Sequence, residues 1–380
     1  MSGKVSFDGE PERGVIDFGV GQPSADLLPL PLVRAASERY FADAQPLELN
    51  YGEKQGDVRF RAALANFLTQ AGGHAASAES LFLTAGTSQA LDFVCMRFTR
   101  PGDTVFVEEP TYFLAFQIFR DHGLNIVGIP MDGGGMNLDR FEQELARRPP
   151  RLVYTIPSFN NPTGRTLSHA RRERLAALSL EHGFIIAADE VYQLLHYGAL
   201  PPPSMGTWVD QGNVLSLGSF SKILAPGMRL GWIQTDAERV KTLLASGSII
   251  SGGNFNHFAS HIVRQLLEDG SLAQLLAELR VSYGARADAM DQALHEHLGG
   301  IATWQKPQGG YFFWLNLPAH LNAVDLQKAA RQARTGFQPG AKCSSAGGLH
   351  NCLRLCFAFY TVPEIREGIA RLGSALKAAA

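Results

Sequence analysis

Seven short apolar runs, separated by segments with helical periodicity, constrain the fold of this chain more than any other feature. Several runs are apolar throughout and do not alternate with polar residues, which is typical of strands covered on both faces. The repetition of strand and helix predicts an α/β domain whose mostly parallel, seven-stranded sheet is flanked by helices. The predicted strands are LFLT (81–84), TVFVE (104–108), NIVGIP (125–130), LVYTI (152–156), FIIAAD (184–189), VLSLGS (214–219) and RLGWIQ (229–234). The predicted helices between them are 87–98, 111–122, 137–147 and 168–182.

The pattern changes after residue 236 and predicts a second, smaller α+β domain. A long helical stretch covers 259–298, with candidate breaks at Gly270 and near Gly284. The segments that follow are two strand-like stretches, 303–317 and 352–359, and two helical ones, 323–334 and 363–378. We therefore expect an N-terminal arm that is partly in the small domain (1–45), a large domain (46–283) and a small C-terminal domain (284–380).

The composition argues against several classes of protein. The 380 residues carry a formal net charge of −2, which gives no electrostatic footprint for nucleic acid or an anionic membrane. The sequence contains no uninterrupted apolar run of about 18 residues, and its polar beginning, MSGKVSFDGEPERG, lacks the apolar core of a signal peptide. The cysteines do not have the spacing of a zinc site, so we expect free thiols and a cytoplasmic protein. They are Cys95, Cys343, Cys352 and Cys356.

Polar residues follow several of the predicted strands, where ligands bind in an open α/β sheet. Gly86, Thr87 and Ser88 open the helix after 81–84, so free backbone N–H groups and two hydroxyls lie at its positive end. This is a candidate anion site, although an ordinary helix cap has the same residues. Tyr112 follows the next strand, and packing alone could explain it.

Three further predicted strands end in, or are followed by, residues whose side chains can take part in catalysis or bind a ligand. Asn161 follows 152–156 in a turn-forming NPTG sequence, and Asp189 ends 184–189, with Tyr192 close behind it. An acid at the end of an apolar strand requires a positive partner, which a structural ion pair would also provide. Lys222 follows 214–219 in apolar surroundings, which lower the pKa of a lysine and make its amine nucleophilic.

A single ligand accounts for all these groups together, namely pyridoxal 5′-phosphate. Its phosphate would bind the helix N-terminus and the three residues Ser219, Ser221 and Arg229. Its ring would stack on Tyr112, its pyridinium N–H would pair with Asp189, and its phenolate oxygen would accept from Asn161 and Tyr192. Its aldehyde would form a Schiff base with Lys222.

The same motifs resemble those of the fold-type I, class I/II aminotransferases, over about residues 16 to 375. The most specific are NPTG (161–164), ADEVY (188–192) and SFSKILAPGMRLGW (219–232), supported by LNYGEKQGDVRFR (49–61), TAGTSQALD (84–92) and LRLCFA (353–358). Their details look most like the 2-aminoadipate, valine–pyruvate and MocR-like branch. The resemblance implies an aspartate-aminotransferase-like fold and transfer of an amino group between an L-amino acid and a 2-oxo acid. It also implies that Lys222 is the base of the proton shift.

The resemblance adds four residues to the expected site. Gln89 would join the phosphate group, and Arg354 would bind the substrate α-carboxylate. Gly21 would line the substrate pocket, together with Asn161. Tyr51 would reach the phosphate of a neighbouring subunit, which implies a homodimer.

Two departures from the family pattern leave the preferred substrate side chain open. Gly21-Gln22-Pro23 stands where many relatives have a more glycine-rich run, and Cys343 occupies a position that is usually aromatic. Two rival activities also remain. One is a lyase acting on the same amino acid–cofactor adduct, and the other is a MocR-like ligand sensor, for which we expect no DNA-binding module before Tyr51. No metal is expected.

Overall fold

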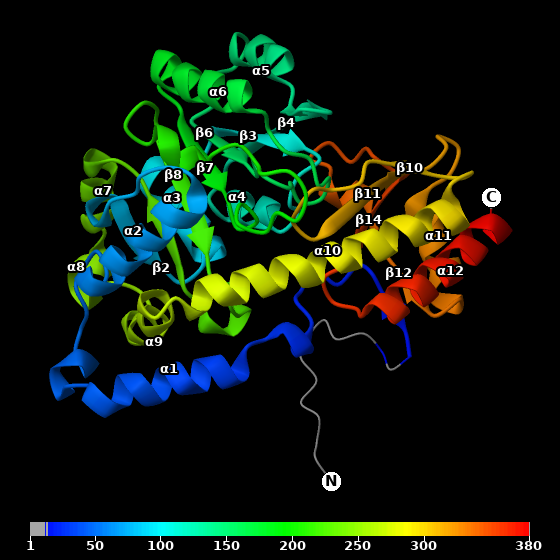
Figure 1. Ribbon diagram of the computed structural model, residues 1–380. Helices are drawn as coiled ribbons and strands as arrows, with labels where there is room; N and C mark the ends of the chain where they lie inside the picture. Colours follow the sequence, from blue (N-terminus) through cyan, green and yellow to red (C-terminus); the bar gives the residue numbers. More distant parts are fainter. Residues whose placement is uncertain (1–11, 13, 380) are drawn as a thin grey trace.

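An eight-stranded sheet forms the centre of the larger part of the molecule (Figure 1). The computed structural model describes residues 12 and 14–379, and within them the strand order is β2-β9-β8-β7-β6-β3-β4-β5. The strands are β2 (Leu81–Thr84), β3 (Thr104–Glu109), β4 (Asn125–Asp132), β5 (Gly135–Met136), β6 (Leu152–Thr155), β7 (Ile185–Asp189), β8 (Val214–Ser219) and β9 (Gly231–Gln234). The run from β8 to β4 is parallel, whereas β9 is antiparallel to both of its neighbours.

All seven predicted strands are present, and the mostly parallel arrangement is confirmed. The predicted strand count was one too low, because β5 forms a hairpin with β4. Gly135 has φ +93°, which suits the tight turn that precedes the pairing. A two-residue strand of this kind leaves no periodic signal in the sequence.

The central strands are apolar throughout because each face of the sheet has its own core. Val105 and Val107 of β3 belong to one buried cluster, whereas Phe106 between them belongs to the other. The first cluster takes side chains from α2 (Val58–Gly72), α3 (Thr87–Phe98) and α4 (Ala115–Asp121). The second is covered by α5 (Leu138–Leu145) and α6 (His169–His182). The predicted α/β layers are therefore confirmed.

A small domain packs beside this sheet (Figure 1). Its antiparallel sheet has the order β10-β11-β14-β13, and its helices α11 and α12 pack against each other. The elements are β10 (Thr303–Trp304), β11 (Phe312–Asn316), α11 (Ala323–Gln332), β12 (Thr335–Gly336), β13 (Gln338–Pro339), β14 (Cys352–Cys356) and α12 (Val362–Ala379). The predicted α+β character of this part is confirmed.

Two long helices connect the domains. The predicted stretch 259–298 is broken at Gly270, into α9 (His257–Glu268) and α10 (Ser271–Leu298). The expected break near Gly284 was wrong, because α10 continues through it. A Cβ at Gly284 would lie 3.2 Å from the Cβ of Tyr197, so this glycine allows close packing and does not end the helix.

The N-terminal residues contact both domains. Strand β1 (Ile16–Asp17) pairs with β12 of the small domain, and α1 (Leu30–Asp43) packs against α9. Part of the predicted arm, residues 1–11 and 13, lies outside the described residues. The expected boundary between 283 and 284 falls inside α10, and the division into domains stays a prediction. Two short helices, α7 (Ala237–Leu244) and α8 (Gly247–Gly252), complete the fold.

None of the helices in the described part of the chain is long and apolar enough to cross a membrane.

Candidate active site

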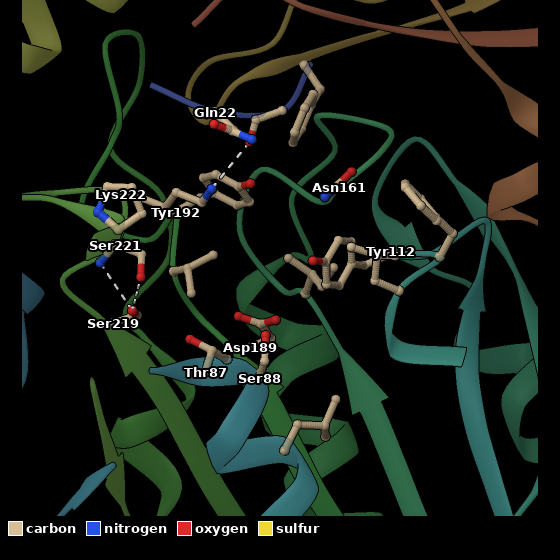
Figure 2. Close-up of a pocket in the computed structure, with 18 of the residues that line it drawn as sticks. Gln22, Thr87, Ser88, Tyr112, Asn161, Asp189, Tyr192, Ser219, Ser221 and Lys222 are labelled. Atoms are coloured by element: carbon tan, nitrogen blue, oxygen red, sulfur yellow. Dashed lines mark hydrogen bonds between the residues drawn. The ribbon is translucent and has the colours of Figure 1, made fainter. Parts of the chain in front are cut away.

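A hollow of about 350 Å³ lies at the carboxyl ends of the parallel strands, where the small domain meets the large one. Strand β7 ends there at Asp189, strand β8 at Ser219, and helix α3 begins there at Thr87. Figure 2 shows Lys222, Asp189, Asn161 and Tyr112 around the same space. The predicted site residues that line the hollow are Gly21, Thr87, Ser88, Tyr112, Asn161, Asp189, Tyr192, Ser219, Ser221, Lys222, Arg229 and Arg354.

Two of the predicted residues do not line the hollow. The side-chain oxygen of Gln89 accepts a hydrogen bond from the backbone N–H of Ala85, 3.0 Å away, so it stabilises the start of α3. Tyr51 is 83% exposed on the surface. The roles of both residues, toward the phosphate and toward a neighbouring subunit, stay predictions.

Asp189 is buried at the floor of the hollow, and only one of its two carboxylate oxygens has a hydrogen-bond partner among the described residues. Its Oδ2 accepts a hydrogen bond from the Tyr154 hydroxyl at 2.8 Å, whereas Oδ1 has no hydrogen-bond partner among the described residues. Burial raises the pKa of Asp189 to about 6. A buried acceptor without a partner is costly, so it fits a ligand that brings an N–H donor, as a pyridinium does. The sequence analysis did not identify Tyr154, which reads as an ordinary strand residue.

The N-terminus of α3 and the turn after β8 form a cradle for an anion. Gly86 has φ +89°, and a Cβ there would come 3.0 Å from Nη2 of Arg229. The Thr87 hydroxyl is buried without a partner among the described residues. The Ser219 hydroxyl donates to the Ser221 oxygen at 2.9 Å, so both hydroxyls lie together. Hydroxyls, a guanidinium and free N–H groups at a helix N-terminus are the donors that bind phosphate.

Lys222 reaches the hollow from the turn after β8. Its Nζ lies 3.4 Å from the carbonyl oxygen of Gly21 and 5.4 Å from the centre of the Tyr311 ring. Burial lowers the pKa of Lys222, so a larger fraction of this amine is neutral than of a lysine in water. A neutral amine is a nucleophile and a base, whereas an ammonium is neither.

Arg354 of β14 closes the opposite side of the hollow. It donates from Nη1 to Oδ1 of Asn161 at 3.0 Å and from Nη2 to the Gly19 carbonyl at 2.7 Å. Its guanidinium carbon lies 4.4 Å from the centre of the Phe312 ring. Because the Asn161 oxygen is occupied by Arg354, its amide nitrogen is the group that can donate to a ligand. The two residues therefore form one cationic, donor-rich wall suited to a carboxylate.

Together these groups fit pyridoxal 5′-phosphate. The unpartnered Asp189 oxygen suits the pyridinium N–H, and the cradle at α3 suits the phosphate. Tyr112 lies beside the Asp189 carboxyl at the rim of the hollow (Figure 2), where it can cover one face of the ring. The donors are oxygen and nitrogen groups of the kind that hold organic phosphates. The described residues contain no cluster of side chains suited to a metal ion.

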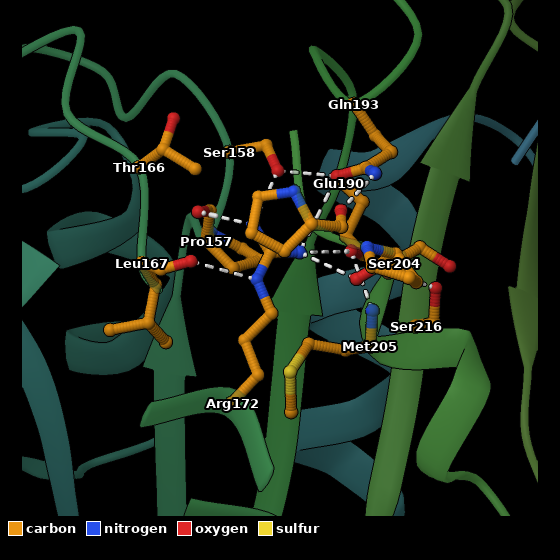
Figure 3. A network of polar contacts seen from close by, with 12 residues as sticks. Pro157, Ser158, Thr166, Leu167, Arg172, Glu190, Gln193, Ser204, Met205 and Ser216 are labelled. Carbon is orange, nitrogen blue, oxygen red and sulfur yellow. Dashed lines mark hydrogen bonds and ion pairs between the residues drawn. The ribbon is translucent and has the colours of Figure 1, made fainter. Parts of the chain in front are cut away.

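A buried ion pair that no motif revealed joins Arg172 to Glu190 (Figure 3). Arg172 of α6 is fully buried, and its Nη1 lies 3.8 Å from Oε1 of Glu190, the residue after Asp189. Arg172 also donates to the Pro157 carbonyl at 2.8 Å and to the Ser158 hydroxyl at 2.7 Å, in the loop that carries Asn161. The pair therefore ties the turn after β7 to the loop after β6.

A second buried acid, Glu108, supports that same loop. It accepts from the Asn160 amide at 2.7 Å, from the Ile156 N–H at 2.9 Å and from the Thr155 hydroxyl at 2.6 Å. Burial raises the pKa of Glu108 to about 7. Arg172 and Glu108 had no motif to reveal them, because each lies in a segment that reads as regular helix or strand.

Replacing Arg172 with methionine is expected to lower the free energy of unfolding by about 3–5 kcal/mol, because Glu190 becomes a buried carboxylate without its cation. The double variant Arg172→Met, Glu190→Gln is expected to be more stable than Arg172→Met alone. Urea denaturation of the cofactor-free protein measures both differences. A single variant within about 1 kcal/mol of wild type would show that the pair does not hold these loops.

Comparison with known proteins agrees with the chemistry of the hollow. The sequence profile of the family Aminotransferase class I and II matches residues 13–372. The chain is 33% identical over 368 residues to an aromatic-amino-acid aminotransferase of Thermococcus litoralis, covering 96% of this chain and 88% of the relative. It is also 28% identical to an uncharacterized HTH-type transcriptional regulator of Bacillus subtilis, covering 97% of this chain and 75% of the regulator.

A solved structure shows the same architecture with a cofactor adduct bound. It is the α-aminoadipate aminotransferase LysN of Thermus thermophilus, complexed with N-(5′-phosphopyridoxyl)-L-leucine. The two chains superpose with a TM-score of 0.87 at 32% identity, covering 96% of this chain and 93% of the other. The chain therefore belongs to the class I and II aminotransferase family, and it is a transaminase that uses pyridoxal 5′-phosphate.

Proposed function

We propose that Lys222 holds the cofactor covalently and carries the proton of transamination, while Arg354 and Asn161 hold the substrate carboxylate. One observation supports this division of roles above the others. Lys222, the unpartnered oxygen of Asp189 and the guanidinium of Arg354 converge on one hollow from three different segments of the chain. A cation for the carboxylate, a base, and a carboxylate for the pyridinium nitrogen are the three groups that amino-group transfer requires.

The bound cofactor would supply an electron sink for the bond that breaks at the substrate α-carbon. Asp189 would accept a hydrogen bond at Oδ1 from the pyridine nitrogen and so keep that nitrogen protonated and positively charged. Lys222 would take the α-proton as a free amine and return it on the cofactor side, which requires the lowered pKa that burial gives it. Thr87, Ser88, Ser219, Ser221 and Arg229 would hold the phosphate end fixed, so that the cofactor stays in one orientation relative to Lys222.

Arg354 would orient the substrate through its α-carboxylate. Its hydrogen bonds to Asn161 and Gly19 fix the plane of the guanidinium before a substrate arrives. A carboxylate that is held in this way is retained through the reaction, so we place decarboxylation below transamination. Phe312 covers one face of the guanidinium and reduces its exposure to water, which strengthens the ion pair.

The substrates of this reaction are an L-amino acid and a 2-oxo acid. A half-reaction tests the assignment: the holoenzyme is mixed with one amino acid at a time, without an acceptor, and the cofactor absorbance is followed. We expect one equivalent of 2-oxo acid per site, with the amino group kept on the cofactor. Addition of a monocarboxylic 2-oxo acid such as pyruvate should then restore the original spectrum. Repeated release of ammonia and pyruvate without an acceptor would identify a lyase instead.

We further propose a homodimer in which Tyr51 reaches the phosphate of the neighbouring site. The segment around it presents apolar side chains to solvent: Leu47 is 78% exposed, Leu49 68% and Tyr51 83%. Apolar residues gathered in this way mark an interface, and a second copy is the commonest occupant.

We also propose that the enzyme is cytoplasmic, because its four buried free thiols would stay reduced there.

A hybrid dimer tests the contribution of Tyr51 directly. Subunits carrying Lys222→Ala and subunits carrying Tyr51→Ala are combined, and mixed dimers are isolated by two affinity tags. If Tyr51 acts across the interface, the hybrid contains one complete site and should have about half of the wild-type activity. If Tyr51 acts within its own subunit or not at all, the hybrid is expected to show no gain over the mean of the two parent variants.

A further inference from the structure

We infer that the side-chain end of the site takes amino acids and 2-oxo acids with uncharged, mainly apolar side chains, and discriminates against dicarboxylic ones. The inference rests on the proposed roles of Lys222 and Arg354. It concerns the one part of the site that neither the motifs nor the cofactor fix.

The first observation behind this inference is the small number of charged side chains in the hollow. Among the described residues that line it, the charged side chains are Asp189, Lys222, Arg229 and Arg354. The three cations already have partners in the proposed reaction, namely the cofactor carbon, the phosphate and the α-carboxylate. A second carboxylate on the substrate would therefore meet no counter-charge from the described residues of this subunit.

The second observation is that the surfaces next to Arg354 are largely apolar. Phe312 lies 4.4 Å and Phe113 lies 5.9 Å from the guanidinium carbon, measured to the ring centres. Leu114, the next residue along, lines the same hollow and is 53% exposed. An apolar side chain that stays exposed inside a binding hollow gains free energy when an apolar ligand covers it. The polar neighbour, Gln22, is uncharged.

Among the described residues, two further cations lie near the site but line a different groove. Lys342 and Arg331 line a groove that shares Gly19 and Gly21 with the site, so the 19–21 backbone contributes to both walls. Glu12 and Asp17 line that groove as well, which balances its charge. If the α-carboxylate of a dicarboxylic substrate is bound at Arg354, this backbone would separate its distal carboxylate from Lys342.

The energetic consequence is large enough to measure. A carboxylate placed against Phe113 and Leu114 loses hydration without gaining a partner, which weakens its binding. A methyl group in the same position gains free energy from burial. Partial hydration at the mouth of the hollow reduces the difference, so we expect discrimination of at least about 10-fold.

The test uses the holoenzyme and two unreactive acids of equal length, pentanoate and glutarate. They differ only in that the terminal methyl of one is a carboxylate in the other. Calorimetry measures each dissociation constant, and wild type is expected to bind pentanoate at least about 10-fold more tightly than glutarate. Glutarate binding equal to or tighter than pentanoate binding would overturn the inference.

A variant that is expected to gain affinity for glutarate provides a second test. Leu114→Arg places a cation where the inference puts the substrate side chain, so it should tighten glutarate binding by at least about 10-fold. Leu180→Arg is the matched control, because Leu180 is 57% exposed on α6 and does not line the hollow. Equal responses of the two variants to glutarate would contradict the placement of the side chain beside Leu114.

Arg354→Ala distinguishes failure of this inference from failure of the proposed function. If binding of both acids is lost in Arg354→Ala, the carboxylate site is correct, and the ratio between the acids then judges the side-chain end alone. If wild type binds neither acid, or if Arg354→Ala binds both as well as wild type does, the proposed carboxylate site is wrong and the inference falls with it.

Discussion

Replacing Lys222 with alanine is expected to reduce turnover by at least about 10⁴-fold, because one substitution removes both the covalent attachment and the base. The variant should still bind the cofactor, since Asp189 and the cradle at α3 remain. It should also accept one amino acid, whose adduct then stays on the enzyme because no amine displaces it. Single-turnover absorbance and steady-state rates measure these two effects separately.

The matched control for this variant is Lys241→Ala. Lys241 is 70% exposed on α7, pairs with Glu238 and does not line the hollow. We expect wild-type turnover from it. Partial rescue of Lys222→Ala by a small amine such as methylamine would indicate that the lost group is a base. Turnover of Lys222→Ala within about 10-fold of wild type would rule out the proposed role of this lysine.

Replacing Asp189 with asparagine is expected to have opposite effects on activity and on stability. Turnover should fall by about 10²–10³-fold, because the preorganised negative charge that would pair with the pyridinium nitrogen is lost. The cofactor-free protein should become more stable at pH 8, because a buried carboxylate with one unpartnered oxygen is replaced by a neutral amide. The shift from the ordinary pKa of 3.8 to about 6 is worth roughly 3 kcal/mol.

The pH dependence of this effect has a definite sign. Because the pKa of Asp189 is higher in the folded than in the unfolded protein, its ionisation destabilises the fold. The penalty is absent below pH 3.8, grows as the pH rises to about 6 and is complete above it. The stability difference between Asp189→Asn and wild type should therefore be large at pH 8 and small at pH 4. Urea denaturation at both values measures it, and a constant difference would contradict the assignment.

The elements that the sequence predicted best are those whose neighbours in the chain decide their structure. Helix 87–98 was predicted with its observed bounds, because a glycine and two hydroxyl residues mark its start. Lys222 and Asp189 were identified because the carboxyl ends of parallel strands meet at one edge, whatever the details of the loops. Arg229 precedes β9 and reaches the same edge because β9 is antiparallel to β8. The common edge brought these residues to one hollow, as expected.

The features that sequence analysis missed depend on contacts between distant segments. Arg172 and Glu190 are 18 positions apart and read separately as an exposed helix residue and a strand end, yet they form a buried pair. Gly284 suggested a break, but the side chain of Tyr197 from another segment gives this glycine a packing role. The side-chain end of the site was equally unreadable, because Phe113 and Phe312 come together only in the folded chain.

Covalent labelling of the holoenzyme tests the central claim most directly. Reduction with sodium borohydride converts a carbon–nitrogen double bond between the cofactor and a lysine into a stable single bond, and mass spectrometry of the digested protein locates it. The label is expected on the peptide that contains Lys222, at one equivalent per chain, and to disappear in Lys222→Ala. A stoichiometric label on any other lysine, or an unlabelled Lys222 in cofactor-saturated enzyme, would contradict the account.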